Sequence, residues 1–177
     1  MLLACGEHGY RSVKAEEVCG ERGACWAAMS FADKDECFAA AYEHAAEELS
    51  RRMALAADQV PGPGRRGGIE AALAILADLL SERPAVARSL LIEARGAGPR
   101  TQAARVRALA ELGEVIDERW RHLGSPGGDA PRMAAPFIVA ATETIAAQEL
   151  SGGEAGALRT AIPDLAQMLE EAYSPVG

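Results

Sequence analysis

The side chains of this sequence that could bind a metal or carry redox chemistry are its cysteines and histidines. They are Cys5, His8, Cys19, Cys25, Cys37, His44 and His122. The four cysteines fall within the first 37 residues, and none forms the Cys-x-x-Cys pair typical of zinc and redox-active sites. A disulfide framework is typical of small secreted domains, whereas this chain has 177 residues. We therefore expect buried thiols and no metal site, with a metal or redox site as the alternative.

Other arrangements that support catalysis do not stand out in the sequence. There is no Ser-His-Asp order, phosphate-binding loop or pair of carboxylates with a recognisable spacing. The glycine-rich stretches at 62–68 and 124–128 lack the Gly-Lys-Ser/Thr ending of a phosphate-binding loop and do not follow a strand, so we expect linkers there. We expect no enzyme, no catalytic residue and no cofactor.

The composition favours a helical scaffold. Apolar residues make up 49% of the chain and aromatic residues only 5%, so the core must consist mainly of Ala, Leu, Val and Ile. Alanine and leucine favour helices, β-branched residues are sparse, and no stretch alternates apolar and polar residues as a strand would. We predict an all-α fold.

Charge and hydropathy limit the partners and the location of the protein. A net charge of −8 argues against a general binder of polyanions. The sequence lacks the run of about 18 apolar residues that a transmembrane helix needs, and no basic stretch precedes its first apolar residues as in a secretory signal. We expect a cytoplasmic protein without a membrane partner. Sixteen of its 18 basic residues are arginines, which together with the abundant alanine and glycine suggests a GC-rich bacterial genome.

The sequence FADKDECF, residues 31–38, carries the signal of a helix start. Asp33 is a favourable N-cap, and Glu36 follows at the three-residue spacing of a capping box. Asp35 and Glu36 place negative charge in the first turn, where the helix dipole favours it. We predict a long helix from Asp33 to about Asp58, with apolar residues recurring every three or four positions.

The remaining helices are expected between breaks rich in proline and glycine. Before residue 31 we expect the end of one helix, stopped near Gly9, then a second helix opened by Ser12 and a short third helix. The later helices are expected over residues 69–80, 84–95, 100–123, 136–150 and 162–173. We place Pro163 as the first residue of the last helix, because proline is well tolerated there.

Two stretches, GEHGYRSVKAEEVC and FADKDECFAAAYE, resemble the DNA-binding domain of the tetracycline-repressor (TetR) family of transcriptional regulators. In that family Gly-Tyr or Gly-Phe closes the first helix, Ser or Thr opens the second, and Phe-x-x-Lys-Glu joins the recognition helix to the fourth. Phe31, Lys34 and Asp35 match the last pattern, with Asp in place of the usual Glu. The ending AIPDLAQMLEEAY is similar to the final helix of the family. The specific match covers about 45 residues at the start of the chain, and the general organisation covers nearly the whole chain.

The resemblance implies a division into two domains. Residues 1–45 would form an incomplete helix-turn-helix DNA-binding head, joined by a long helix to a ligand-binding and dimerisation domain over residues 46–177. Family members carry a basic arm and the first half of the first helix ahead of this point, so we expect Met1 to be an internal methionine or the chain to be truncated.

The resemblance also implies DNA-binding residues in the head. Lys34 matches the family position that contacts a DNA phosphate, where the free N–H groups of the helix end would help; a solvated surface lysine is the alternative. The candidate DNA-binding residues are Ser12, Trp26, Ser30 and Lys34.

The larger domain would hold a pocket for a small hydrophobic effector and would pair with a second copy through its last two helices. The bulky candidates for the pocket, for which plain core packing is the alternative, are Leu91, Leu112, Trp120, Met133 and Phe137. Polar contacts to the effector, or surface positions, are expected for Glu93, Arg95 and His122. Besides Phe137, the candidate residues of the homodimer interface are Ile138, Ile145, Leu165, Leu169 and Tyr173.

Together these features predict a dimeric, TetR-like transcriptional regulator whose binding to operator DNA is controlled by a small-molecule effector. The stretch GACWAAMSF, residues 23–31, contains no Arg, Lys, Asn or Gln to read base edges. This favours the alternative, a ligand-binding dimer of the same fold that does not bind operator DNA.

Overall fold

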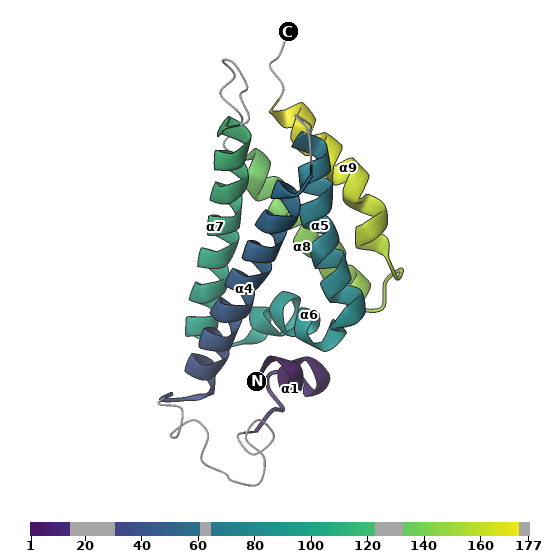
Figure 1. Ribbon diagram of the computed structural model, residues 1–177. Coiled ribbons are helices and arrows are strands. Elements are labelled where there is room, and N and C mark those ends of the chain that lie inside the picture. Colours follow the sequence, from purple (N-terminus) through teal and green to yellow (C-terminus); the bar gives the residue numbers. More distant parts are fainter. Residues whose placement is uncertain (15–30, 61–64, 123–132, 174–177) are drawn as a thin grey trace. The chain divides into compact units, whose positions relative to one another are not determined.

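A computed structural model describes residues 1–14, 31–60, 65–122 and 133–173 (Figure 1). The regular structure in these residues is helical throughout, so the predicted all-α fold class is confirmed. The elements are α1 (Leu2–His8), α4 (Lys34–Asp58), α5 (Arg65–Glu82), α6 (Pro84–Leu91), the 3-10 helix η2 (Glu93–Gly96), α7 (Pro99–His122), α8 (Ala134–Leu150) and α9 (Ala157–Ala172). None of these helices combines the length and the hydropathy that crossing a membrane requires. The second and third helices expected before residue 31 lie largely outside the described residues.

The chain forms two compact units, and each unit is assembled from two separate stretches of sequence. The first unit contains residues 1–48 and 79–108, and the second contains residues 49–78 and 109–177. The predicted division at residue 45 treats each domain as one continuous stretch. In the structure, α6, η2 and the start of α7 complete the first unit.

Helix α1 packs against α6 in the first unit (Figure 1). Gly6 permits this close approach, because a Cβ atom at this position would lie 1.7 Å from the carbonyl oxygen of Ala85. The hydroxyl of Ser89 donates a hydrogen bond to the carbonyl of Leu2, which adds a polar contact between the two helices. Gly9 ends α1 as predicted, with a φ of 82° that glycine adopts at little cost.

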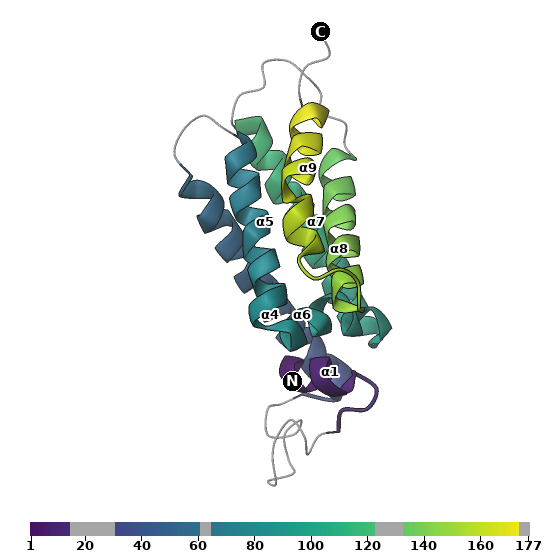
Figure 2. The ribbon, with the colours of Figure 1, turned by 90° about the vertical axis from the view of Figure 1, so that its right-hand side faces the viewer.

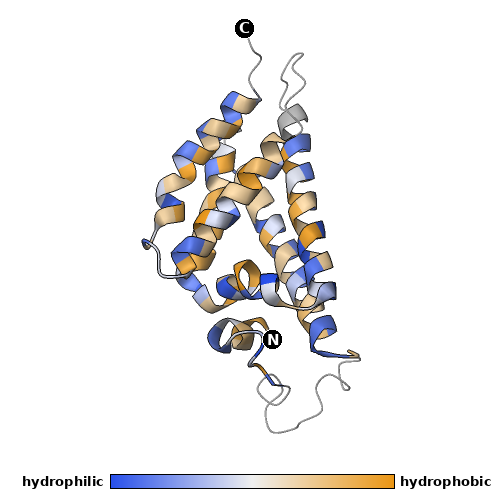
Figure 3. Cartoon of the chain, turned by 180° about the vertical axis from the view of Figure 1, so that it is seen from behind, coloured by the Kyte–Doolittle hydropathy of each residue, from blue (hydrophilic) through white to orange (hydrophobic). Residues whose placement is uncertain are grey.

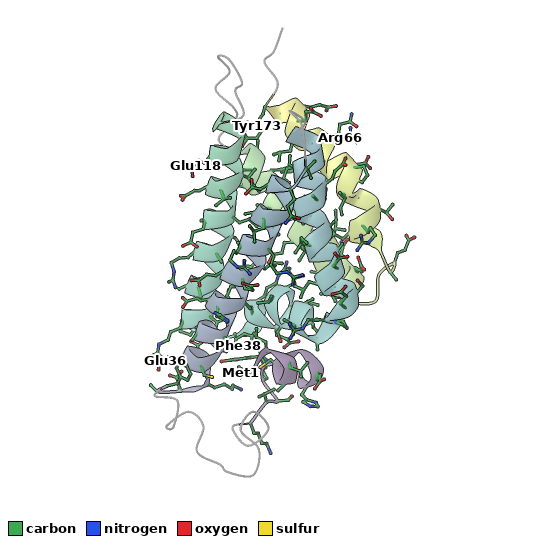
Figure 4. All side chains as sticks on the ribbon, in the orientation of Figure 1. Met1, Glu36, Phe38, Arg66, Glu118 and Tyr173 are labelled. Atoms are coloured by element: carbon green, nitrogen blue, oxygen red, sulfur yellow. The ribbon has the colours of Figure 1, made fainter. Side chains whose placement is uncertain are left out.

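Phe38 lies at the centre of the core of the first unit. Its side chain is fully buried and packs with Cys5, Val13 and other apolar residues of the unit. The ring of Tyr10 is tilted against the Phe38 ring, with 5.0 Å between the centroids. Met1 packs against the same core, and both Met1 and Phe38 are labelled in Figure 4. The aromatic residue that ends FADKDECF therefore anchors α4 to α1.

The described cysteines, Cys5 and Cys37, are buried free thiols, as expected. Burial raises the pKa of the Cys5 thiol from 9.0 to about 11 and raises the pKa of Cys37 in the same direction. Among the residues that the structure describes, no three Cys, His, Asp or Glu side chains are grouped to hold a metal ion. Cys19 and Cys25 lie outside those residues.

The capping box at the start of α4 is confirmed. Asp33 Oδ1 accepts a hydrogen bond of 2.9 Å from the N–H of Glu36, which is the expected N-cap contact. Glu36 Oε2 in turn accepts a hydrogen bond of 2.5 Å from the N–H of Ala32, one residue before the position that a standard capping box uses. The signal in FADKDECF is therefore realised as a closed helix start.

Asp35 caps a second helix, α7, from outside that helix. Its Oδ2 accepts a 2.9 Å hydrogen bond from the N–H of Arg100, and its Oδ1 accepts hydrogen bonds from the N–H and the hydroxyl of Thr101, at 3.2 and 2.7 Å. Gly98 leaves room for this carboxylate, since a Cβ atom there would lie 2.4 Å from Asp35 Cγ. The free N–H groups at the start of α7 are thus satisfied by a residue far away in sequence.

Helices α8 and α9 lie side by side in the second unit (Figure 2). The carboxylate of Glu149, near the end of α8, accepts hydrogen bonds of 2.9 Å from the N–H of Gly156 and 3.0 Å from the N–H of Leu158. Helix α9 therefore begins at Ala157, and Pro163 lies inside it. The prediction that Pro163 opens this helix is wrong, because a carboxylate from the preceding helix provides the cap.

Candidate ligand pocket

A cavity with almost entirely apolar walls lies inside the second unit, and we call it the apolar pocket. Its volume is about 80 Å³, several times the roughly 10–15 Å³ that one water molecule needs. Helices α4, α5, α7, α8 and α9 all contribute side chains to its wall. Its residues belong to the second unit alone.

Small residues on α4 and α5 create the space. Ala54 and Ala57 on α4 face the pocket together with Gly68 and Ala72 on α5. The two helices approach closely here, as the position of Gly68 shows: a Cβ atom on this residue would lie 3.3 Å from the carbonyl oxygen of Ala57. Side chains of one carbon or none leave unfilled volume next to bulkier neighbours.

Larger apolar side chains close the other sides of the apolar pocket. Leu112, Val115 and Ile116 come from α7, Ile138 comes from α8 and Leu169 from α9. Ile138 and Leu169 are buried, whereas Val115 is 47% exposed and lies near solvent. This arrangement can bind a molecule with apolar surface by removing that surface from water.

One of the five side chains predicted for an effector pocket, Leu112, lines the apolar pocket. Leu91 instead packs on the core around Phe38 in the first unit. Met133 and Phe137 are 70% and 57% exposed and are not part of the wall. The reason is that α8 turns the face carrying Ile138 toward the pocket.

Four further residues were predicted to contact the effector, and none of them is placed at the apolar pocket among the described residues. Trp120 and His122 belong to α7, but their side chains lie outside the described residues. Glu93, expected as a polar contact to the effector, belongs to the first unit, where its Oε2 accepts a 2.7 Å hydrogen bond from the N–H of Tyr10. Arg95 is exposed in the same unit.

The pocket residues that the sequence analysis missed include both small and large side chains. Ala54, Ala57 and Ala72 are too small to stand out in the sequence as pocket walls, and Met53 has the pattern of an ordinary core residue. A usable signal exists: small residues recur at helical spacing on each of two helices, as Ala54 and Ala57 do on α4 and Gly68 and Ala72 do on α5. Which of the many alanines share a face with a cavity is decided by packing between distant segments.

The residues predicted for the homodimer interface are mostly buried inside the protomer. Ile138, Leu165, Leu169 and Tyr173 are each less than a tenth exposed, and Ile145 is half-buried. The Tyr173 hydroxyl donates a hydrogen bond to the Asp117 carboxylate of the same chain. As a correction, these four buried side chains are not a surface for a second copy, because their helices turn this apolar face into the unit. The homodimer itself stays a prediction.

The exposed face of α8, unlike the buried residues predicted for the interface, is accessible to a second copy of the chain. It carries residues that are apolar or uncharged: Met133, Pro136, Phe137, Ala140, Thr144 and Gln148. Figure 3 shows the hydrophobic colouring that dominates α8. Of the predicted interface, only Phe137 and part of Ile145 reach the surface.

The predicted DNA contact Lys34 is engaged with its own chain. Its Nζ donates a 2.8 Å hydrogen bond to the carbonyl oxygen of Tyr10 and lies 3.5 and 3.4 Å from the carbonyl oxygens of Arg11 and Val13. The same ammonium group is 4.4 Å from the centroid of the Tyr10 ring. Ser12 lies exposed in the turn that these contacts hold. Trp26 and Ser30 lie outside the described residues.

A second cavity in the second unit, which we call the acidic cavity, has a different character. Its volume is about 440 Å³, and residues of α7 and α8 line it. Apolar side chains are interspersed there with the carboxylates of Glu114, Asp117 and Glu143. Of these, Glu143 is 9% exposed and Asp117 accepts the hydrogen bond from Tyr173. Any ligand of this cavity would meet negative charge, unlike a ligand of the apolar pocket.

No family model, no curated protein and no solved structure matches this chain. The TetR family therefore stays a prediction from the motifs in residues 6–19 and 31–43, and a function has to be inferred from the geometry of the two units.

Proposed function

We propose that this chain is a dimeric regulator of the TetR type, in which a small molecule bound in the apolar pocket controls binding to operator DNA. The observation that carries the proposal is the apolar pocket itself, whose wall is contributed by five helices. A ligand there would contact all five and would favour the helix arrangement that fits it best. Such differential binding is what control by an effector requires. We place the regulator in the bacterial cytoplasm.

The start of α4 supports the DNA-binding part of the proposal. FADKDECF forms a capped helix start with Lys34 as its first helical residue. This is the position that contacts a DNA phosphate in the family that the sequence resembles. The contacts of Lys34 with the carbonyls of residues 10–13 would hold the chain leading into the expected recognition segment.

The exposed face of α8 supports the dimer. Met133 and Phe137 are both more than half exposed, and large exposed apolar side chains that share a face favour an interaction surface. The exposed positions of this helix carry no charge, so two copies could meet there across a twofold axis without placing like charges together. We therefore propose that this face, rather than the buried residues of α9, forms the centre of the dimer.

The test is a fluorescence anisotropy titration of the protein against labelled DNA from its own promoter region at low salt. We expect saturable binding that weakens with salt. Replacing Lys34 by alanine is expected to weaken binding and to reduce the salt slope by about one. Arg52→Ala, an exposed basic residue of the same helix, is the matched control and is expected to bind like the native chain. Absence of saturable DNA binding by the native protein would contradict the regulator.

One observation favours a second candidate function, a ligand-binding dimer of the same type that does not bind DNA. The ammonium group of Lys34 is already surrounded by three carbonyl oxygens and an aromatic ring. A phosphate would have to share or displace these contacts. Ligand binding together with a flat anisotropy titration would establish this alternative.

A further inference from the structure

Among the residues that the structure describes, the wall of the apolar pocket contains no charged side chain. An ionised ligand entering it would lose its hydration and would find no opposite charge in the wall, which costs several kcal/mol. The acidic cavity of the same unit shows that α7 does carry carboxylates, but Glu114 and Asp117 line that cavity and not this one. The apolar pocket therefore discriminates against charge of either sign.

Of the described wall residues, Ser50 supplies the polar side chain. Its hydroxyl can donate one hydrogen bond and accept another. The other wall residues are glycine or have hydrocarbon or thioether side chains, such as Met53 and Leu73. A ligand can thus satisfy about one polar group here, and every further polar group would be buried without a partner.

The volume limits the size of the ligand. A cavity of about 80 Å³ favours a compact molecule, because the rest of a larger one would remain outside it near Val115, which is 47% exposed. Water is a poor occupant, because water in a buried site needs two to four polar partners and this wall offers few. A small hydrocarbon group gains free energy on entering without losing hydrogen bonds.

We infer that the effector is an uncharged, compact, hydrocarbon-rich molecule with at most one hydroxyl or carbonyl group. This inference rests on the proposed function, because it takes the apolar pocket as the effector site. The ligand's hydrocarbon part lies against the alanine wall formed by α4 and α5, and its single polar group meets the Ser50 hydroxyl.

The test is a calorimetric titration of the full chain with four compounds of similar shape: toluene, benzyl alcohol, benzylammonium and benzoate. Toluene and benzyl alcohol are expected to bind. The two ions are expected to bind this pocket at least about 100-fold more weakly, because a buried unpaired charge costs several kcal/mol. Comparable binding of an ion in the apolar pocket would overturn the inference and leave the pocket as the effector site.

Variants assign the binding to the pocket. Ala72→Phe fills the space from α5, and Ala74→Phe places the same side chain on the same helix outside the wall. We expect the first to abolish binding of the neutral pair and the second to preserve it. Ala54→Leu on α4, with Ala56→Leu as its control, repeats the comparison with a smaller change should the phenylalanine at position 72 unfold the chain. Benzylammonium binding that survives Ala72→Phe lies outside the apolar pocket and agrees with the inference.

Ser50→Ala separates the polar contact from the apolar ones. It is expected to weaken benzyl alcohol binding by about three- to tenfold, the value of one hydrogen bond, and to leave toluene unchanged. An equal effect on both compounds would overturn the role of Ser50.

Failure of the proposed function looks different from failure of this inference. If none of the four compounds binds the native chain, the apolar pocket is not an effector site and the regulator loses its control element. DNA binding is measured separately, so that result leaves the DNA-binding part of the proposal standing.

Discussion

The side chain of Asp33 makes two separate contacts at the start of α4. It caps the helix through the N–H of Glu36, and its Oδ2 lies 2.8 Å from Nη1 of Arg100. The hydrogen bond from Glu36 and the guanidinium of Arg100 favour the ionised form and hold the pKa of Asp33 below its usual 3.8. A carboxyl whose pKa is lower in the folded protein stabilises the fold above the unfolded pKa, and this stabilisation is lost as the pH falls through the folded pKa.

The first prediction concerns this pH dependence. Asp33→Asn keeps an N-cap acceptor but removes the charge, so we expect it to lower the melting temperature near neutral pH. The difference from the native chain should begin to shrink below about pH 4 and vanish as the pH falls through the lowered folded pKa of Asp33, where the native carboxyl also becomes neutral. Melting curves followed by circular dichroism between neutral and acidic pH measure it. A difference that persists undiminished at about pH 2 would show that charge is not the cause.

A single pocket residue could be predicted from the sequence only where its side chain is large and apolar. Leu112 was a candidate because it is bulky and on an apolar stripe, and it does line the pocket. Phe137 was a candidate for the same reason but lies exposed on the other face of its helix. The helical spacing of small residues does not single out Ala54 and Ala72 among the many alanines, because an alanine that borders a void has the same sequence pattern as one that fills a contact. The distinction depends on which distant side chain faces it.

At the scale of elements, the contact between α1 and α6 depends on one glycine. A Cβ atom on Gly6 would meet the backbone of Ala85, with 1.7 Å to its oxygen and 2.8 Å to its Cα. Backbone atoms cannot turn aside as the end of a flexible side chain can. The two helices would have to separate to admit even one methyl group.

The second prediction is therefore that Gly6→Ala destabilises the protein by at least about 2 kcal/mol. The sign is informative, because alanine is the better helix former and propensity alone would stabilise α1 by about 0.5–1 kcal/mol. Gly96→Ala is the control, since a Cβ atom there meets nothing within 4 Å. Urea unfolding of both variants provides the measurement. A stabilising Gly6→Ala would mean that α1 does not pack against α6 as described.

Element boundaries were predictable where the signal is local. The capping box at Asp33, the proline at the start of α6 and the glycine at the end of α1 all act on their immediate neighbours, and these boundaries are confirmed. The start of α9 was misplaced because Glu149 caps it from another helix. Pro163 then lies where its missing N–H interrupts the helical hydrogen bonds, a position that sequence rules disfavour.

At the scale of the whole molecule, the third prediction concerns the dimer. Phe137→Asp places a charge at the centre of the exposed face of α8, so we expect it to weaken dimerisation by about tenfold or more. Folding should be retained, because this side chain is 57% exposed. Val106→Asp is the control: its side chain is 62% exposed on α7, and we expect the native association state.

Sedimentation velocity over a range of protein concentrations measures the association state. A native chain that remains monomeric at all concentrations would contradict the proposed dimer. A dimer unaffected by Phe137→Asp would place the interface on another face.

The division into units was only partly predictable from sequence. The domain division predicted at residue 45 is close to one boundary between the units, which falls after residue 48. Residues 79–108, however, return to complete the first unit. The buried partners of Phe38 include Val86 and Leu90 on α6. The local sequence around Phe38 and the local sequence of α6 do not indicate that the two segments pack together. Such pairings follow from the packing of the entire chain, which periodicity within one helix does not encode.

The buried thiol of Cys5 can serve as a probe of local opening in the first unit. With a pKa near 11, little of it is thiolate at neutral pH, and its side chain has no exposed surface for an alkylating reagent to reach. Reaction at this sulfur must wait until α1 leaves its neighbours. The rate at which Cys5 is alkylated therefore reports how often α1 detaches, and no cysteine has to be engineered into the chain.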